Sequence, residues 1–105
     1  MTTVALPLRQ DARVFAFTVD LTGDDYQFEF YWNDQDLTWY FDMSTAQGVR
    51  LISGVKVVLG TLLARRFIAG FPPGFFIALD LSNQDQEARL NDLGTRVKVF
   101  YVDEA

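Results

Sequence analysis

The segment YQFEFYWN, residues 26–33, decides the fold of this chain. Its large apolar side chains fall at every second position, and a period of two places them on one face of a β-strand. The preceding segment RVFAFTVDL, residues 13–21, has the same period. Between the two lies TGDD, residues 22–25, which is typical of a tight turn because glycine accepts a positive φ and aspartate hydrogen bonds to nearby backbone. The two segments therefore predict a β-hairpin.

The alternation continues beyond the hairpin. A polar turn at residues 33–36 leads into a third strand at 38–43, and three sequential strands joined by short turns form a meander. A further turn at residues 46–48 leads into 49–58, which is rich in β-branched residues and is divided by Ser53 and Gly54. Glycine inside a strand pattern predicts a bulge or a sharp bend.

The second half of the chain is less regular. Residues 59–70 fit either a short helical turn or a strand, whereas Pro72-Pro73-Gly74 is a firm break. Strands are expected at 75–81 and 95–102, with a polar loop at 82–93 that has room for one helical turn around 86–90. We predict an all-β fold: a small antiparallel β-sandwich or partly open barrel of six to seven strands, with at most one short helical turn. Residues 1–105 are expected to form a single domain, in which 1–10 is an N-terminal arm or edge strand.

Strand parity predicts a core of nine large residues that are nearly buried and packed together. They are Phe15, Phe17, Phe28, Phe30, Trp32, Trp39, Phe41, Val97 and Val99.

Composition excludes several function classes. The formal charge is −5, from 14 acidic and 9 basic residues, which argues against nucleic-acid binding. The chain has no cysteine and no histidine, so the usual ligands of zinc, haem and iron–sulfur sites are lacking and no cofactor is expected. The absence of cysteine also fits synthesis in a reducing cytosol. We find no apolar run long enough for a signal peptide or a membrane span.

No residue pattern predicts catalysis. Aspartates cluster at 20–25 and at 34–36, but each cluster lies in an expected turn, where aspartate is favoured for local hydrogen bonds alone. The serines lack a histidine or cysteine partner, and no glycine pattern matches a phosphate-binding loop. We therefore expect a binding protein rather than an enzyme, with no catalytic and no metal-binding residues.

The number of aromatic residues exceeds what the core requires. Ten of the 105 residues are phenylalanine, and aromatic side chains concentrate binding energy at protein interfaces. Six of them form a hypothetical interface set: Tyr31, Tyr40, Phe71, Phe75, Phe76 and Phe100. The alternative is a carbohydrate- or small-ligand-binding β-module that uses the same exposed aromatics.

Five short motifs then occur in a particular order. They are the aromatic-Asn turn Tyr31-Trp32-Asn33, the aromatic strand at 38–42, the apolar strand that Gly48 begins, Pro72-Pro73-Gly74, and Leu93-Gly94-Thr95-Arg96-Val97 with its continuation to Val102. In order and spacing, from Phe15 to Val102, this set resembles a family of small phage tail and baseplate proteins.

The resemblance implies a virion structural protein, a subunit of a phage tail in the baseplate or at the tail-tube terminus. It also implies assembly in the bacterial host cytoplasm, contacts with other tail proteins, a homo-oligomer in the particle, and neither a nucleic-acid partner nor a membrane span. The family supplies no catalytic residues that could be assigned to this chain. Its Trp, Asn, Gly and Pro positions are expected to be architectural.

Overall fold

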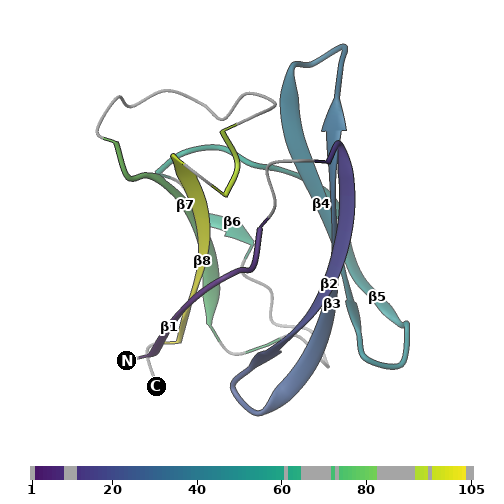
Figure 1. The fold of residues 1–105 in the computed structure, drawn as a ribbon. Helices are drawn as coiled ribbons and strands as arrows, with labels where there is room; N and C mark the ends of the chain where they lie inside the picture. Colours follow the sequence, from purple (N-terminus) through teal and green to yellow (C-terminus); the bar gives the residue numbers. More distant parts are fainter. Residues whose placement is uncertain are drawn as a thin grey trace.

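A computed structural model of the chain shows two four-stranded antiparallel sheets packed face to face (Figure 1). The structure describes residues 2–8, 12–60, 62–64, 72, 74–82, 92–94 and 96–103. Within these residues there are eight strands and no helix, and the two sheets do not join into a closed barrel. The predicted all-β sandwich is thus confirmed. The expected helical turn at 86–90 lies outside the described residues.

The first sheet is the predicted meander, in the order β2-β3-β4-β5. Its strands are β2 (Val14–Leu21), β3 (Asp24–Asn33), β4 (Thr38–Thr45) and β5 (Arg50–Lys56). β2 and β3 pair without interruption along all eight residues of β2. The expected irregularity in β5 is also present, because the β4–β5 register shifts twice and Gly54 has a φ of 66°.

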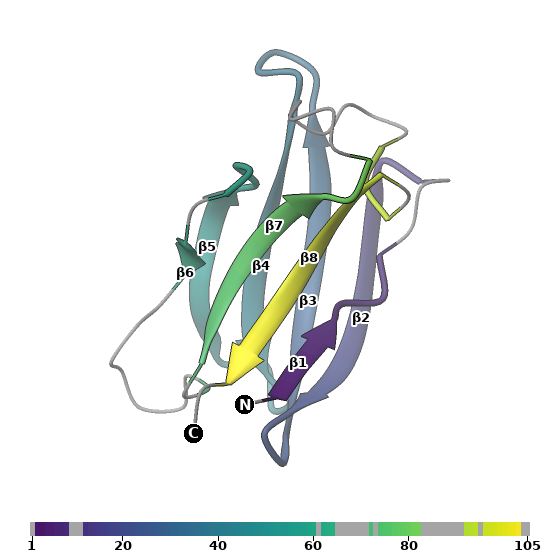
Figure 2. The same cartoon turned by 90° about the vertical axis from the view of Figure 1, so that its left-hand side faces the viewer.

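The second sheet joins the two ends of the chain, in the order β1-β8-β7-β6. Its strands are β1 (Thr2–Ala5), β6 (Leu62–Ala64), β7 (Phe75–Asp80) and β8 (Val97–Asp103). The N-terminal segment is therefore an edge strand, paired with β8. Residues 59–70 fitted either a helical turn or a strand, and within them Leu62–Ala64 form the short strand β6. Figure 2 shows this sheet from its outer side, with β1 and β6 at its two edges.

An aromatic core lies between the sheets. Seven of the nine predicted core residues are buried, whereas Phe17 and Trp32 are half-buried and pack against the rim of the core. The Phe76 ring from the second sheet lies 5.6 Å from the ring of Phe28 and 6.3 Å from that of Phe41, both on the first sheet. On its own sheet it packs 5.3 Å from Tyr101. Phe76 therefore joins the aromatic clusters of the two sheets.

A buried hydroxyl ties three segments together. Tyr101 is fully buried, and its hydroxyl accepts a hydrogen bond of 3.0 Å from the Gly74 N–H. The same hydroxyl lies 2.9 Å from Thr22 Oγ1, which also donates to Asp103 at 2.8 Å. Because Thr22 lies in the β2–β3 turn, these bonds connect the tip of the first hairpin to β8 in the opposite sheet. No larger residue fits in place of Gly74, since a Cβ there would lie 2.1 Å from the Val102 carbonyl oxygen.

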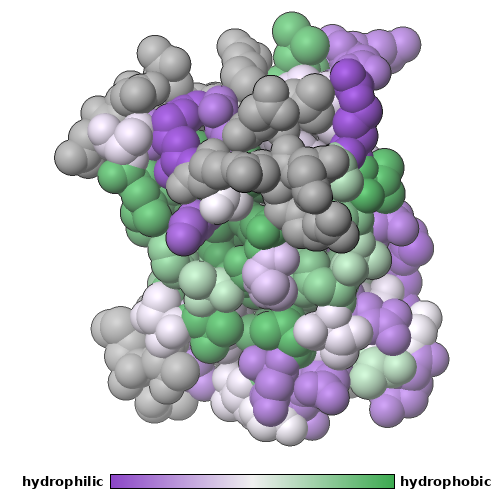
Figure 3. All heavy atoms as spheres, in the orientation of Figure 1, coloured by the Kyte–Doolittle hydropathy of each residue, from purple (hydrophilic) through white to green (hydrophobic). Residues whose placement is uncertain are grey.

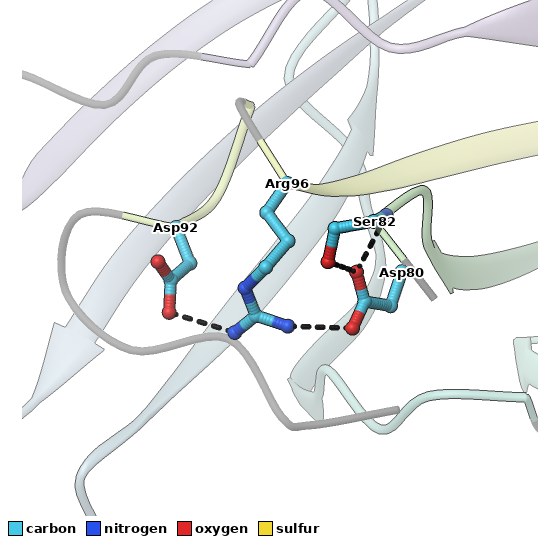
Figure 4. Close-up of polar contacts among 4 residues, drawn as sticks. All are labelled: Asp80, Ser82, Asp92 and Arg96. Carbon is cyan, nitrogen blue, oxygen red and sulfur yellow. Dashed lines mark hydrogen bonds and ion pairs between the residues drawn. The ribbon is translucent and has the colours of Figure 1, made fainter. Parts of the chain in front are cut away.

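An arginine in the turn before β8 connects this turn to the end of β7 through ion pairs. Arg96 donates to Asp80 at the end of β7 and to Asp92, each over 2.7 Å (Figure 4). The second oxygen of Asp80 accepts bonds from the N–H and the hydroxyl of Ser82. The hydrogen bond to Asp92, and then that to Asp80, raises the pKa of the Arg96 guanidinium against the opposing effect of burial. The Leu-Gly-x-Arg-Val motif is thus architectural here. Leu93 is buried, Gly94 has a φ of 87°, and Arg96 forms the ion pairs with Asp80 and Asp92.

We predict that Phe28→Ala will lower the free energy of unfolding by about 3–5 kcal/mol, because the Phe28 ring is almost completely buried among other rings and a cavity would remain. Urea unfolding measures this loss. Val14→Ala is the control, since the Val14 side chain is 58% exposed and its truncation should cost about 0.5 kcal/mol or less. A loss below about 1 kcal/mol for Phe28→Ala would contradict the proposed core.

A second prediction concerns the buried hydroxyl. Tyr101→Phe should cost about 1–3 kcal/mol, because it removes the acceptor of the buried Gly74 N–H without changing the packing of the ring. Tyr26→Phe is the matched control: the Tyr26 ring is also buried, but its hydroxyl has no hydrogen bond within the described part of the chain. Equal melting temperatures for the two variants would show that the hydroxyl network does not stabilise the fold.

Candidate assembly surfaces

The six residues of the predicted interface set fall into different environments. Tyr31 and Tyr40 lie on the outer face of the first sheet, whereas Phe75 and Phe100 lie on the outer face of the second. Phe76 is fully buried and belongs to the core, so its assignment to a surface was wrong. Phe71 lies outside the described residues. The set is therefore not one patch but two, on opposite sides of the sandwich.

The first patch is a pair of stacked tyrosines. Tyr31 on β3 and Tyr40 on β4 are directly opposite in the register, and their rings lie 6.1 Å apart at an interplanar angle of 14°. The Tyr31 hydroxyl donates to Asp42 Oδ1 at 3.1 Å, and the Tyr40 hydroxyl donates to Asp36. Both rings are thus held in place before any partner arrives.

Charged neighbours adjust the ionisation of this pair. The hydrogen bond to Asp36 raises the pKa of Tyr40 and lowers the pKa of the Asp36 carboxyl. Burial, followed by the charge of Asp42, raises the pKa of Tyr31. Lys56 lies 3.6 Å from Asp36, so the carboxylate is shared between a phenol and an ammonium group. The tyrosines are neutral hydrogen-bond donors at physiological pH.

A polar hollow of about 190 Å³ lies next to the tyrosine pair, on the same sheet face. Its lining residues are Ala16, Gln27, Phe28, Glu29, Asp42, Ser44 and Arg50. Asp42 is already occupied, because Oδ1 accepts bonds from the Gly54 N–H at 2.8 Å and from Tyr31, and Arg50 lies 3.5 Å from Oδ2. The carboxylate therefore holds the bulge of β5 in place. Neither tyrosine lines this hollow, and its one aromatic lining residue, Phe28, is buried in the core. The hollow therefore lacks the exposed aromatic platform that the alternative function, sugar binding, requires.

The second patch is apolar and extends across three strands. On β7 the outward side chains are Phe75, Ile77 and Leu79, and on β8 they are Lys98, Phe100 and Val102. The register pairs Phe75 with Val102 and Ile77 with Phe100, and Ala5 of β1 lies on the other side of Phe100. These side chains are all partly or fully exposed, and Leu79 is 40% exposed. We call this surface the apolar face.

Two members of the apolar face, Phe75 and Phe100, belong to the interface set predicted from the sequence, and its other members do not. The missed residues are Ala5, Ile77, Leu79 and Val102. A usable signal was present: β7 reads FFIALD, which is apolar on both faces, and a strand of this kind is typically covered on both sides. Within the described part of the chain, the core covers only the side of β7 that carries Phe76 and Ala78.

Other kinds of site find no support in the described residues. Within them, no group of three or more acidic residues is arranged to hold a metal ion. Asp34 instead pairs with Arg13 at 2.8 Å and accepts a bond from the Trp32 indole at 2.7 Å, and both lower the pKa of its carboxyl. In the described ranges no helix is long and apolar enough to cross a membrane.

Comparison with known proteins assigns the family. No curated protein matches the sequence. A family model described as "Cyanophage baseplate Pam3 plug gp18" matches residues 3–104 of the 105-residue chain. The match includes both sheets, the Tyr101 network and both surface patches. The chain therefore belongs to the family of the cyanophage baseplate plug gp18, a family of phage baseplate structural proteins.

Proposed function

We propose that this chain is a subunit of a phage baseplate that works through contacts with neighbouring tail proteins, and that the apolar face is its principal contact. The family match over residues 3–104 supports the role in a baseplate. The observation that carries the choice of contact surface is the apolar face. Two aromatic and four aliphatic side chains share one sheet surface with a single lysine. Exposed apolar surface of this kind marks sites of protein association.

The tyrosine pair supplies a second, different contact. Tyr31 and Tyr40 lie on the outer face of the first sheet, so the sandwich separates them from the apolar face. Two surfaces that point in opposite directions let one subunit bridge two neighbours, as layers or rings of an assembly require. The chemistry differs as well: aliphatic burial suits one side, whereas hydrogen bonds from fixed phenols suit the other.

The proposed role needs no reaction chemistry. The whole sequence lacks histidine and cysteine, and the family is a structural one, both of which favour a protein that is not an enzyme and binds no cofactor. We place the mature protein in the virion tail, after assembly in the cytoplasm of the bacterial host and as several copies in each particle.

The test uses the chain co-expressed with the baseplate proteins that the same genome encodes. Phe100→Asp should leave folding intact, because the side chain points outward. It should reduce incorporation into the purified baseplate by about thirtyfold or more, as expected for an aromatic anchor worth about 2 kcal/mol or more. Incorporation is measured by quantitative mass spectrometry, and folding by circular dichroism.

Gln47→Asp is the control for this test, since it adds the same charge at an exposed position of the β4–β5 turn, away from both patches. Wild-type chain that never enters the baseplate would contradict the proposed function. Incorporation of Phe100→Asp at the wild-type level would remove the apolar face from it and leave the tyrosine pair, which Tyr40→Asp tests in the same assay.

A further inference from the structure

The described strands form two open sheets, and their four edges differ in how they are protected against pairing with another chain. Exposed edge strands pair readily with foreign strands, and proteins blunt them by making them short, bulged or charged. β1 has four residues, and β6 has three with a register shift. β5 carries two register shifts, Gly54 in a left-handed conformation, and Lys56. Three of the four edges are thus blunted.

The fourth edge, β2, has none of these features. It is eight residues long and pairs with β3 in one unbroken register, so it contains no bulge, and its sequence VFAFTVDL has neither proline nor lysine. Its one charge is Asp20, at the end of the strand. By the same criteria, β2 is a strand ready to accept another strand beside it.

The hydrogen-bond phase shows which backbone groups are available on β2. The Trp32 N–H donates to the Arg13 carbonyl at 2.8 Å. Arg13 directly precedes β2, and the Arg13–Trp32 pair continues the β2–β3 register. Because bonded and non-bonded pairs alternate in an antiparallel ladder, the odd-numbered residues of β2 bond to β3. The even-numbered residues Val14, Ala16, Thr18 and Asp20 direct their N–H and C=O groups away from the sheet. Nothing in the described part of the chain pairs with these groups.

The core is also incompletely covered along this edge. Phe17 and Val19 of β2, and Val4 of β1, pack against the core but stay partly exposed. Phe17 stacks 5.4 Å from Phe28 and 5.8 Å from Phe30, so its partly exposed ring is continuous with the aromatic core. Figure 1 views the sandwich from the side on which β1 and β2 form the edges, and Figure 3 shows apolar residues gathered across the middle of that side.

We propose that the outer edge of β2 receives an extended segment of a neighbouring baseplate subunit, which adds a fifth strand to the first sheet. This inference rests on the proposed function and deepens it, because it names the edge and the mode of contact. Main-chain hydrogen bonds to the even-numbered residues supply affinity, and alternate side chains of the incoming segment supply specificity.

The surface of β2 specifies the chemistry of that segment. Side chains that point inward must be apolar, since they cover Phe17 and Val19. At the β2–β3 turn the segment passes Asp20, which is opposite Asp25 and next to Asp24, and all three are exposed. A lysine or arginine at that position complements the acidic turn. The occupant is therefore an apolar strand with a basic residue near one end. The basic residue nearest to β2, Arg13, already pairs with Asp34 of its own chain, so the β2 strand of a second copy does not supply it and the segment belongs to a different baseplate protein.

The decisive measurement is residue-resolved hydrogen exchange of the wild-type chain, alone and within the purified baseplate. In the isolated chain the amides of Ala16, Thr18 and Asp20 should exchange freely, whereas those of Phe15, Phe17 and Val19 are protected by β3. Inside the baseplate the even-numbered amides should exchange at least about tenfold more slowly. This alternation distinguishes strand addition from burial of the whole strand under a partner, which would slow exchange without regard to parity.

A proline variant gives an independent reading. Thr18→Pro removes only an outward N–H, which edge strands tolerate, so the fold should survive while incorporation into the baseplate falls by about tenfold or more. Thr18→Ala keeps the N–H and should incorporate normally. If Thr18→Pro does not fold, Thr18→Lys takes its place, with Gln27→Lys as its control: Gln27 is the cross-strand partner of Thr18 on the same exposed face, but on the interior strand β3.

The outcomes separate this inference from the proposed function. A chain that enters the baseplate with its even-numbered amides still exchanging freely would overturn the strand addition and leave the function intact. A chain absent from the baseplate would overturn the function itself. Concentration-dependent protection of the same amides in the isolated chain would show that a second copy occupies the edge, which also overturns the proposed occupant.

Discussion

The packing of one ring against the opposite sheet holds this sandwich together. Phe76 contacts Phe28 and Phe41 across the interface and Tyr101 beside it, all in a fully buried cluster. Without cysteine, no disulfide bond joins the two sheets. Their association therefore depends on the burial of aromatic surface, at about 150–250 Å² for each ring, with the Tyr101 hydroxyl fixing the alignment. The surfaces available for assembly are the side chains that this arrangement leaves outside.

The sequence predicted the first sheet well because its information is local. In β3 and β4, large apolar and polar residues alternate clearly, and short turns leave only one way to pair neighbouring strands. The core prediction was least accurate at the rim. Phe17 lies on an edge strand and Trp32 near a strand end, so each is covered on fewer sides than parity alone suggests.

The second sheet was harder to predict, for a physical reason. β7 is apolar on both faces, so no polar residue marks which of the neighbours Phe75 and Phe76 points inward, and Phe76 was assigned to the wrong side. The pairing of β1 with β8 joins segments at opposite ends of the chain, and no local pattern encodes it. The apolar face inherits this difficulty, because only the register of three strands brings its residues together.

The pairing of β8 between β1 and β7 also governs when the fold can form. The residues of the first sheet, Val14–Lys56, are contiguous and can pair while the rest of the chain is still being synthesised. The second sheet cannot close until Val97–Asp103 leaves the ribosome, because β8 is the strand that holds β1 and β7. Until the second sheet forms, the aromatic side of the meander is exposed to solvent during translation. Chaperone binding would protect it in that interval. The pairing of β8 with β1 and β7 is thus the last step of folding, and it completes the core and the apolar face together.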